Sequence, residues 1–252
     1  MGASMDRIAK RSVVAGKRRA AAKAHAPRAR LATPIARGFD VQRARRHLAR
    51  VDPALGEWMR RIGRLQHEWH REFEPVDALA RAILYQQLAG KAAATIVGRV
   101  EKHLPRGPQL CAEDLRDASH EGLRACGVSG NKQRALKDLA EKALAGVVPA
   151  VQELQQLDDE ALVARLTAVR GIGRWTVEMM LIFRLGRADV LPVDDLGVRR
   201  GAEILLGRKR ALKPRRLAEI GQRWAPFRTL ASLYLWRIAD FPREAAVKRS
   251  QG

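Results

Sequence analysis

The chain has 252 residues, which is long enough for one large or two modest hydrophobic cores. Its 48 Lys and Arg residues exceed its 27 Asp and Glu residues, and the net charge of +21 favours a polyanionic partner over a merely solvated basic surface. Two cysteines, Cys111 and Cys126, are too few for a four-cysteine iron–sulfur cluster or zinc site. No apolar run approaches the roughly 20 residues of a membrane span, so we expect a cytoplasmic protein without membrane contact.

Residues 1–40 have a composition of their own. They carry ten Lys and Arg residues against two Asp residues, and no aromatic residue precedes Phe39. Such a segment buries little apolar area, so we predict a disordered basic arm or a frayed helix. Two interpretations stay open for it: an arm that binds nucleic acid non-specifically, and a tail without a function.

From Val41 onward, apolar residues recur at three- and four-residue spacing, which is typical of amphipathic helices. No segment alternates apolar and polar residues as a half-buried strand does. We therefore predict an all-α core over residues 41–245, in which Gly90 interrupts the helical pattern, and a short tail over residues 246–252. The predicted helices cover residues 75–88, 92–100, 113–119, 121–125, 131–144, 158–169, 174–185, 195–206, 214–224 and 226–238.

A tight turn joins the predicted helices at residues 158–169 and 174–185. Its Gly171-Ile172-Gly173 sequence lets a phosphate approach the backbone without a Cβ in the way. The helix that begins at Arg174 points its free N–H groups and the positive end of its dipole into this turn. The pattern indicates a backbone clamp for nucleic-acid phosphate, although alone it also fits a plain connection between helices.

Two adjacent carboxylates follow about 20 residues after the turn, in residues 192–195 (PVDD). Asp194 and Asp195 stand directly before a predicted helix, where aspartate commonly serves as an N-cap. A carboxylate near a phosphate clamp repels DNA, so a protein that only binds DNA has no need of one there. The turn and the carboxylates together favour chemistry on DNA.

These features resemble the helix-hairpin-helix DNA glycosylases, and further motifs resemble the 3-methyladenine DNA glycosylase II family within that superfamily. The resemblance covers about residues 50–240 and implies a two-lobed helical bundle whose hairpin occupies about residues 158–185. The matching motifs are residues 82–88 (AILYQQL) with 91–93 (KAA), 127–129 (GVS) with Lys132 and 139–140 (LA), 171–176 (GIGRWT), Trp224 with Pro226 and Arg228, and 234–237 (YLWR).

The resemblance implies that Asp195 is the catalytic residue, because in the family the catalytic Asp is followed by three residues and then a basic or aromatic pair, here Arg199-Arg200. Asp194 is then expected to cap the helix or hold the loop. One carboxylate is enough for an alkylated purine, because such a base is already cationic and leaves without protonation. Asp195 is expected to place negative charge beside the developing oxocarbenium sugar and to help orient water.

The resemblance also implies a pocket for a base that is flipped out of the duplex. Trp175, Trp236, Met179 and Tyr85 are expected to form it, and Tyr234 is a further aromatic candidate. Met179 replaces a tyrosine of the family, which leaves a softer wall. For any single tryptophan, ordinary core packing is the alternative interpretation.

Contacts to DNA and to one ion follow from the same resemblance. We expect Gln87 or Leu88 to fill the gap that the flipped base leaves, and we expect no cofactor and no iron–sulfur cluster. The hairpin residues expected to contact DNA are Gly171, Ile172, Gly173, Arg174 and Thr176. The backbone carbonyls expected to hold a Na⁺ or K⁺ ion are those of Thr167, Val169 and Ile172.

The sequence is therefore expected to encode a monofunctional DNA glycosylase that hydrolyses the N-glycosidic bond of alkylated bases in base excision repair. It is expected to act as a monomer on double-stranded DNA, associated with the nucleoid of a bacterial cytoplasm. Trp175 stands where lyase members of the superfamily carry a Schiff-base lysine, so strand cleavage is not expected. The alternatives are a non-catalytic helix-hairpin-helix DNA-binding protein and a glycosylase for other damaged or mismatched bases.

Overall fold

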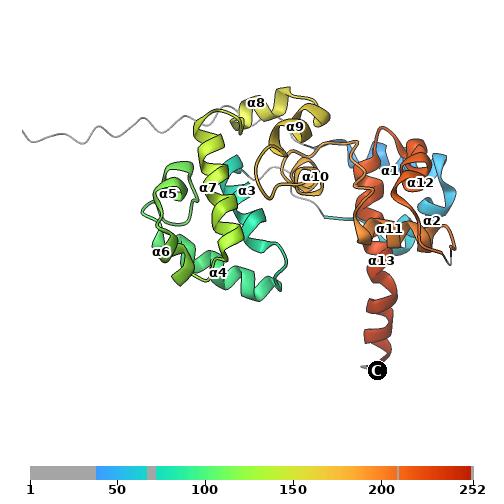
Figure 1. The fold of residues 1–252 in the computed structure, drawn as a ribbon. Helices are drawn as coiled ribbons and strands as arrows, with labels where there is room; N and C mark the ends of the chain where they lie inside the picture. Colours follow the sequence, from blue (N-terminus) through green and yellow to red (C-terminus); the bar gives the residue numbers. More distant parts are fainter. Residues whose placement is uncertain (1–37, 67–71, 209, 251–252) are drawn as a thin grey trace, which may run out of the picture. The chain divides into compact units, whose positions relative to one another are not determined.

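The computed structural model describes residues 38–66, 72–208 and 210–250 of the chain. Every regular element in these ranges is a helix, which confirms the predicted all-α fold (Figure 1). Residues 1–37 of the expected basic arm lie outside the described residues. None of the described helices combines the length and the apolar composition that a membrane span needs.

The helices of residues 75–144 form a first group. They are α3 (Pro75–Tyr85), α4 (Gly90–His103), α5 (Ala112–Asp117), α6 (His120–Ala125) and α7 (Gly130–Leu144). α7 packs against α3, α5 and α6, and α3 also packs against α4 (Figure 1). Pro75 stands in the first turn of α3, where a missing N–H is tolerated, and the carboxylate of Glu74 caps this helix by accepting from the amide of Asp77.

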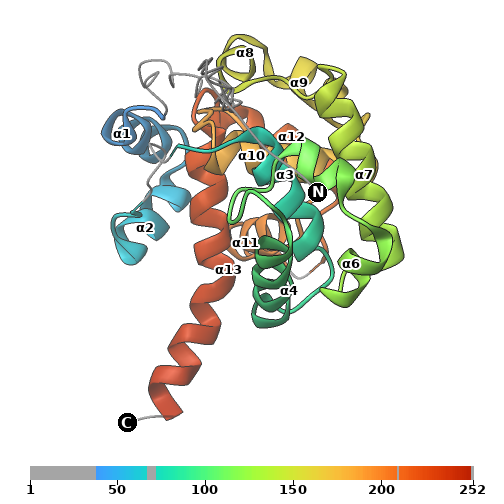
Figure 2. The same ribbon diagram turned by 90° about the vertical axis from the view of Figure 1, so that its left-hand side faces the viewer.

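A second group combines the first and last described helices. Its members are α1 (Val41–Val51), α2 (Pro53–Ile62), α11 (Leu196–Leu205), α12 (Pro214–Gly221), the 3-10 helix η1 (Gln222–Trp224) and α13 (Arg228–Ser250). α1 and α2 pack against each other and against α13, so segments far apart in the sequence lie side by side (Figures 1 and 2). α11 lies so close to α13 that a Cβ on Gly201 would be 1.9 Å from the carbonyl oxygen of Leu235. This contact requires glycine and fixes α11 on α13.

Three helices connect the groups: α8 (Val151–Gln156), α9 (Asp159–Leu166) and α10 (Arg174–Phe183). α9 and α10 pack against each other as a helical hairpin, which lies between the two groups in Figure 1. Asp158 caps α9 as predicted, because its carboxylate accepts from the amide of Ala161 at 2.7 Å. The hairpin therefore lies within the predicted range.

Some helix boundaries differ from the predictions. α3 ends at Tyr85 because Gln87 adopts a φ of +57°, which interrupts a right-handed helix. Gly90 was expected to interrupt the helical pattern before residue 92, but it is the first residue of α4. α13 begins at Arg228, two residues after Pro226, and continues to Ser250.

Candidate active site

The connection between α9 and α10 is a tight turn. Gly171 has a φ of +80°, which favours glycine, whereas Gly173 has a φ of −97°, which any residue adopts. A Cβ on Gly173 would meet nothing within 4 Å, so its backbone faces open space. No side chain of the described residues caps the N-terminus of α10, and the first N–H groups of this helix are therefore available to an anion.

Neighbouring elements hold the turn in place. The amide side chain of Gln86, at the end of α3, donates to the carbonyl of Gly171 (Nε2–O 2.8 Å). The carboxylate of Asp138, on α7, accepts from the amide of Arg170 at 2.6 Å. Ile172 is buried in the core. Two hydrogen bonds from neighbouring elements and the burial of Ile172 thus fix the turn that was predicted as a phosphate clamp.

Two of the hairpin residues that we expected to contact DNA are engaged within the protein. The guanidinium of Arg174 donates to both carboxylate oxygens of Glu160 on α9, at 2.8 and 2.5 Å. The amide of Thr176 donates to the carbonyl of Gly173 at 2.9 Å, and its side chain is buried. The exposed backbone of Gly171 and Gly173 is therefore the part of the turn that is most open to a ligand.

Asp195 is the N-cap of α11 and accepts three hydrogen bonds. Its Oδ1 accepts from the amide of Val198 and from the indole Nε1 of Trp236, and its Oδ2 accepts from the indole Nε1 of Trp175, each at 2.8 Å. The expectation that Asp194 caps this helix is therefore wrong, because the carboxylate of Asp195 occupies the capping position. Three donors fix this half-buried carboxylate, and two of them are aromatic residues expected in the pocket.

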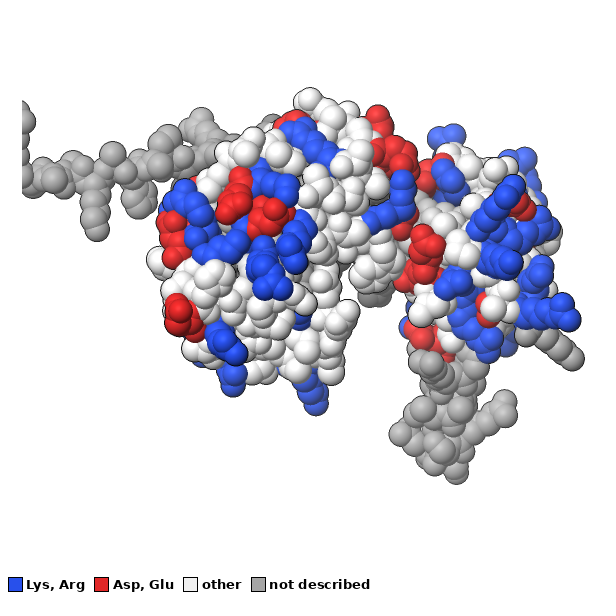
Figure 3. Space-filling model, viewed as in Figure 1, with Lys and Arg blue, Asp and Glu red and all other residues white. Residues whose placement is uncertain are grey.

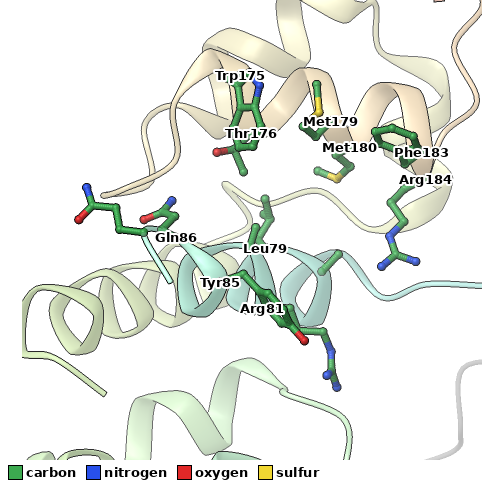
Figure 4. A pocket seen from close by; sticks show the side chains of 13 residues that line it. Leu79, Arg81, Tyr85, Gln86, Trp175, Thr176, Met179, Met180, Phe183 and Arg184 are labelled. Carbon is green, nitrogen blue, oxygen red and sulfur yellow. The ribbon is translucent and has the colours of Figure 1, made fainter. Parts of the chain in front are cut away.

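A cavity of about 790 Å³ lies between α3 and α10. Tyr85, Trp175 and Met179, three of the residues expected in the base pocket, line this cavity. Figure 4 shows the α10 side chains above Leu79, which rises from α3. Phe183 also lines the cavity, although the sequence analysis did not select it. It lies four residues after Met179 and hence on the same face of the helix, which is a signal that a helical projection would have given.

Trp236 is connected to the cavity through Phe183. The two rings are stacked, with centroids 5.7 Å apart and an interplanar angle of 27°. Trp236 was expected to form part of the pocket wall, but it does not line the cavity. It packs behind Phe183 and donates to Asp195 instead. The aromatic surface thus continues from the cavity to the carboxylate.

Tyr234 is not part of the pocket, which corrects the sequence-based expectation. Its side chain is fully buried, and its hydroxyl donates to the carbonyl of Gly63 at 2.8 Å and accepts from Arg45. Tyr234 and Trp236 are two residues apart on α13, so they point about 200° apart around the helix axis. Tyr234 therefore fastens α13 to α1 and to the end of α2.

The turn between α3 and α4 carries the residues expected to fill a vacated base stack. Gln87 is exposed and has the left-handed backbone already noted, and Leu88 is 40% exposed. Gln86, directly before them, is bonded to Gly171. The turn is thereby held beside the hairpin, with two candidate side chains in solvent.

Glu178 is a buried carboxyl group that the sequence analysis missed. It lies on α10, is 7% exposed and has its Oε1 4.0 Å from the Arg174 guanidinium. Burial raises the pKa of Glu178 to about 7; Arg174 lowers it, and the negative charges of Asp194, Glu160 and Asp195 raise it further. The electrostatics near Asp195 therefore include a group that titrates near neutral pH.

The turn also contains the carbonyls expected to hold a monovalent cation. The carbonyl of Val169 accepts from the amide of Ile172 at 3.0 Å, and among the described residues no hydrogen bond is present to the carbonyls of Thr167 and Ile172. Cys111 and Cys126 are both free thiols. In the described part of the chain, no group of three or more His, Cys, Asp and Glu side chains is arranged to hold a metal ion.

The chemistry of the site follows from these contacts. An aromatic and thioether-lined cavity accepts a flat, apolar or cationic group. A fixed carboxylate that is hydrogen-bonded to Trp175, a residue of the cavity wall, stabilises positive charge that develops nearby. An N–H-rich turn beside both can hold a phosphate.

Comparisons with known proteins agree with this arrangement. A family model described as HhH-GPD superfamily base excision DNA repair protein matches residues 80–226. DNA-3-methyladenine glycosylase 1 of Schizosaccharomyces pombe is 37% identical over 207 residues, which cover 81% of this chain and 91% of the relative.

Two solved structures resemble the fold closely. One is a Schizosaccharomyces pombe 3-methyladenine DNA glycosylase in complex with abasic DNA, with a TM-score of 0.70 and 38% identity, covering 77% of this chain and 95% of that one. The other is a DNA-3-methyladenine glycosidase from Bacillus halodurans, with a TM-score of 0.73 and 36% identity, covering 80% of this chain and 91% of that one.

Proposed function

The chain belongs to the HhH-GPD superfamily of base excision DNA repair proteins, and from this premise we propose that it is a monofunctional DNA glycosylase for alkylated bases of the 3-methyladenine type. The observation that carries the proposal is the carboxylate of Asp195, which accepts from the indoles of Trp175, a residue of the aromatic cavity wall, and of Trp236. The relatives named as 3-methyladenine glycosylases support the substrate class.

The cavity between α3 and α10 is the proposed seat of the flipped base. An alkylated purine is electron-poor and cationic, so it is attracted to the electron-rich faces of aromatic rings. Trp175, Tyr85 and Phe183 provide such rings, and Met179 and Met180 provide adaptable contacts between them. A neutral, normal base gains less from these faces, which favours damaged bases over undamaged ones.

Asp195 supplies the charge that the reaction needs. When the N-glycosidic bond breaks, the electron pair leaves with the cationic base, which becomes neutral, and positive charge develops on the sugar. The carboxylate stabilises that charge, and water attacks the sugar and transfers its proton to solvent or to Asp195. Trp236 and Val198 occupy Oδ1, whereas Oδ2 accepts from Trp175 and keeps a lone pair for the sugar or the water.

The hairpin and the α3–α4 turn are the proposed DNA contacts. The N–H groups at the start of α10 hold a phosphate. The carbonyls of Thr167, Val169 and Ile172 would hold a Na⁺ or K⁺ ion, which would add positive charge beside that phosphate. Gln87 or Leu88 fills the gap in the duplex. The protein acts as a monomer on double-stranded DNA.

A base-release assay tests this function. The protein is incubated with duplex DNA treated with a methylating agent, and the free bases are identified by mass spectrometry. Alkylated purines are expected in solution, with abasic sites left in the DNA. Binding without release of any base would favour a non-catalytic DNA-binding protein, and release confined to oxidised or mismatched bases would favour a different glycosylase.

Strand cleavage by β-elimination is not expected. A lyase attacks the sugar with a lysine amine, and Trp175, whose indole nitrogen has no available lone pair, stands at that position. Lys132 is held elsewhere, because its amine donates to the carbonyl of Leu84 at 2.7 Å. Borohydride reduction during the reaction should therefore trap no adduct. A covalent protein–DNA adduct in good yield would contradict the hydrolytic mechanism.

A further inference from the structure

A second cavity, of about 350 Å³, lies against α1, outside the site described above. It is lined by Arg43, Arg46, His47, Arg50, Pro226 and Phe227. The four α1 residues recur at three- and four-residue spacing, so they share one face of the helix. From first to last they span about 10 Å along its axis. The cavity is thus bordered by a row of basic side chains.

The guanidinium groups of this row have no acidic partners in the described part of the chain. Neither Arg43, Arg46 nor Arg50 makes a side-chain hydrogen bond or an ion pair there. The acids at the ends of α1 serve other groups: Asp40 caps α1, and Asp52 accepts from Leu55 and Trp224. Other arginines are paired, as Arg60 is with Glu57 and Arg216 with Glu219. Figure 3 shows that many further Lys and Arg side chains lie on the part of the molecule that holds α11 and α12.

His47 provides a separate sign of a missing partner. Its ring packs edge-on against Phe227, with centroids 5.5 Å apart. Its Nε2 is buried and has no hydrogen-bond partner among the described residues. Buried polar atoms in folded proteins almost always have such a partner. The cavity therefore combines three exposed arginines that have no acidic partner with a buried ring nitrogen that has no hydrogen-bond partner.

We propose that the α1 cavity binds the phosphate groups of a DNA strand, as a second backbone contact separate from the hairpin. Phosphate oxygens match the planar fork of arginine and accept from a histidine N–H. The row of about 10 Å matches about three phosphates of one strand, which rise 3.4 Å each. The segment that leads into α1 cannot neutralise the row, because residues 1–40 carry ten Lys and Arg residues against two Asp residues. A polyanion is the occupant that this charge pattern fits.

The inference rests on the proposed action on DNA but not on the chemistry at Asp195. Undamaged duplex DNA therefore serves as the probe, and base release is measured separately at saturating DNA. Three proteins are compared by fluorescence anisotropy over a range of salt concentrations. They are the wild type, the triple variant R43Q/R46Q/R50Q, and the control R60Q/R116Q/R216Q, which loses the same charge from arginines that are paired with acids. Thermal unfolding of each protein verifies that it is folded.

The triple variant is expected to reduce the slope of log Kd against log salt by about 2 to 3, since each phosphate contact contributes about 0.9. Raising the salt concentration from 50 to 200 mM weakens binding by a certain factor in each protein. This factor should be about 15 to 60 times smaller for the triple variant than for the wild type. The control should keep most of the wild-type slope, and base release at saturating DNA should persist in both variants. If the wild type released no base, the proposed function would be wrong, but the salt dependence of DNA binding would still test the α1 cavity.

Two results would overturn the inference. An unchanged slope in the triple variant, or an equal reduction in the control, would mean that the row makes no specific phosphate contact. Titration with inorganic phosphate covers the other source of the same chemistry. If phosphate binds the wild type and not the triple variant while the DNA slope is unchanged, the cavity takes a free phosphate and not a DNA strand.

Discussion

Asp195 and Asp52 occupy the same local arrangement in two regions of the molecule. Each is the N-cap of a helix and accepts from the backbone amide three residues later. Each also accepts from the indole of a distant tryptophan, which is Trp224 for Asp52 (2.9 Å) and Trp236 for Asp195 (2.8 Å). The capping motif alone therefore does not distinguish a catalytic aspartate from a structural one.

The surroundings of the two carboxylates differ. Asp52 is 5% exposed, and Trp224 is completely buried. Asp195 accepts from a further indole, that of Trp175, which is 48% exposed and lines the large cavity. A sealed carboxylate can only stabilise the fold, whereas a half-buried one that is bonded to a residue of a cavity wall can act on a substrate. We therefore propose that access to the carboxylate separates the role of Asp195 from that of Asp52.

Replacing Asp195 with Asn should produce the largest effect on activity. Removing one preorganised electrostatic group typically costs about 10²- to 10³-fold in rate, so the single-turnover rate of base release should fall by at least that range while DNA binding persists. The matched control is Asp194→Asn, which removes the same charge from the exposed neighbour. An inactive Asp194→Asn protein beside an active Asp195→Asn protein would reverse the assignment.

Glu178 makes the Asp195 region sensitive to pH. Its pKa is raised from 4.5 to about 7 in the folded protein, so the native state holds this proton more tightly than the unfolded state does. The free energy of unfolding should therefore fall as pH rises from about 4.5 to about 7, by up to about 3 kcal/mol. In Glu178→Gln this fall should be absent. Urea unfolding at pH 5 and pH 8 measures it, and an identical fall in the variant would contradict the account.

Replacing Asp52 with Asn should affect stability and leave the chemistry intact. The new side-chain amide can place its NH₂ group, which is a donor, against the indole N–H of Trp224, so that the indole loses its acceptor. A buried polar group without a partner costs about 1–3 kcal/mol. The free energy of unfolding should decrease by about that amount. Chemical denaturation measures it. A variant as stable as the wild type would show that the buried bond to Trp224 contributes little.

Trp236→Phe tests the indole bond without removing the carboxylate. The phenyl ring can still pack on Phe183, but the donor to Asp195 Oδ1 is lost. We expect a decrease of about tenfold in the rate of base release, which corresponds to about 1.4 kcal/mol and lies near the lower end for a hydrogen bond to a charged group. Trp224→Phe is the matched control and should change stability only. Equal rate losses in the two variants would remove the distinction between the regions.

Local patterns in the sequence were enough to predict the hairpin and most of the helices, although none of the predicted ranges covered α1, α2 or α8. Pro75 and Asp158 mark helix starts through contacts within one turn, and such contacts can be read from neighbouring residues. Asp195 and Trp175 were found because they belong to motifs. Their hydrogen bond was not predictable, since it joins residues 20 positions apart through the packing of different helices.

The sequence-based predictions that the structure corrects also have physical explanations. The role of Asp194 as a cap was wrong because which of two adjacent carboxylates reaches the helix amides depends on the loop geometry. Tyr234 was expected as a further aromatic candidate for the pocket, but helix geometry puts it and Trp236 on different faces of α13. The raised pKa of Glu178 depends on its burial, which its own sequence neighbours do not reveal.

The most direct test compares Asp195→Asn and Asp52→Asn side by side, as the single-turnover rate constant for base release per folded molecule. Both proteins are assayed on the same methylated duplex, and the folded fraction of each sample is measured by circular dichroism. The account predicts a rate near that of the wild type for folded Asp52→Asn and a rate at least about 10²-fold lower for Asp195→Asn. Equal rates in the two variants would contradict the claim that only Asp195, the carboxylate bonded to the cavity residue Trp175, takes part in the reaction.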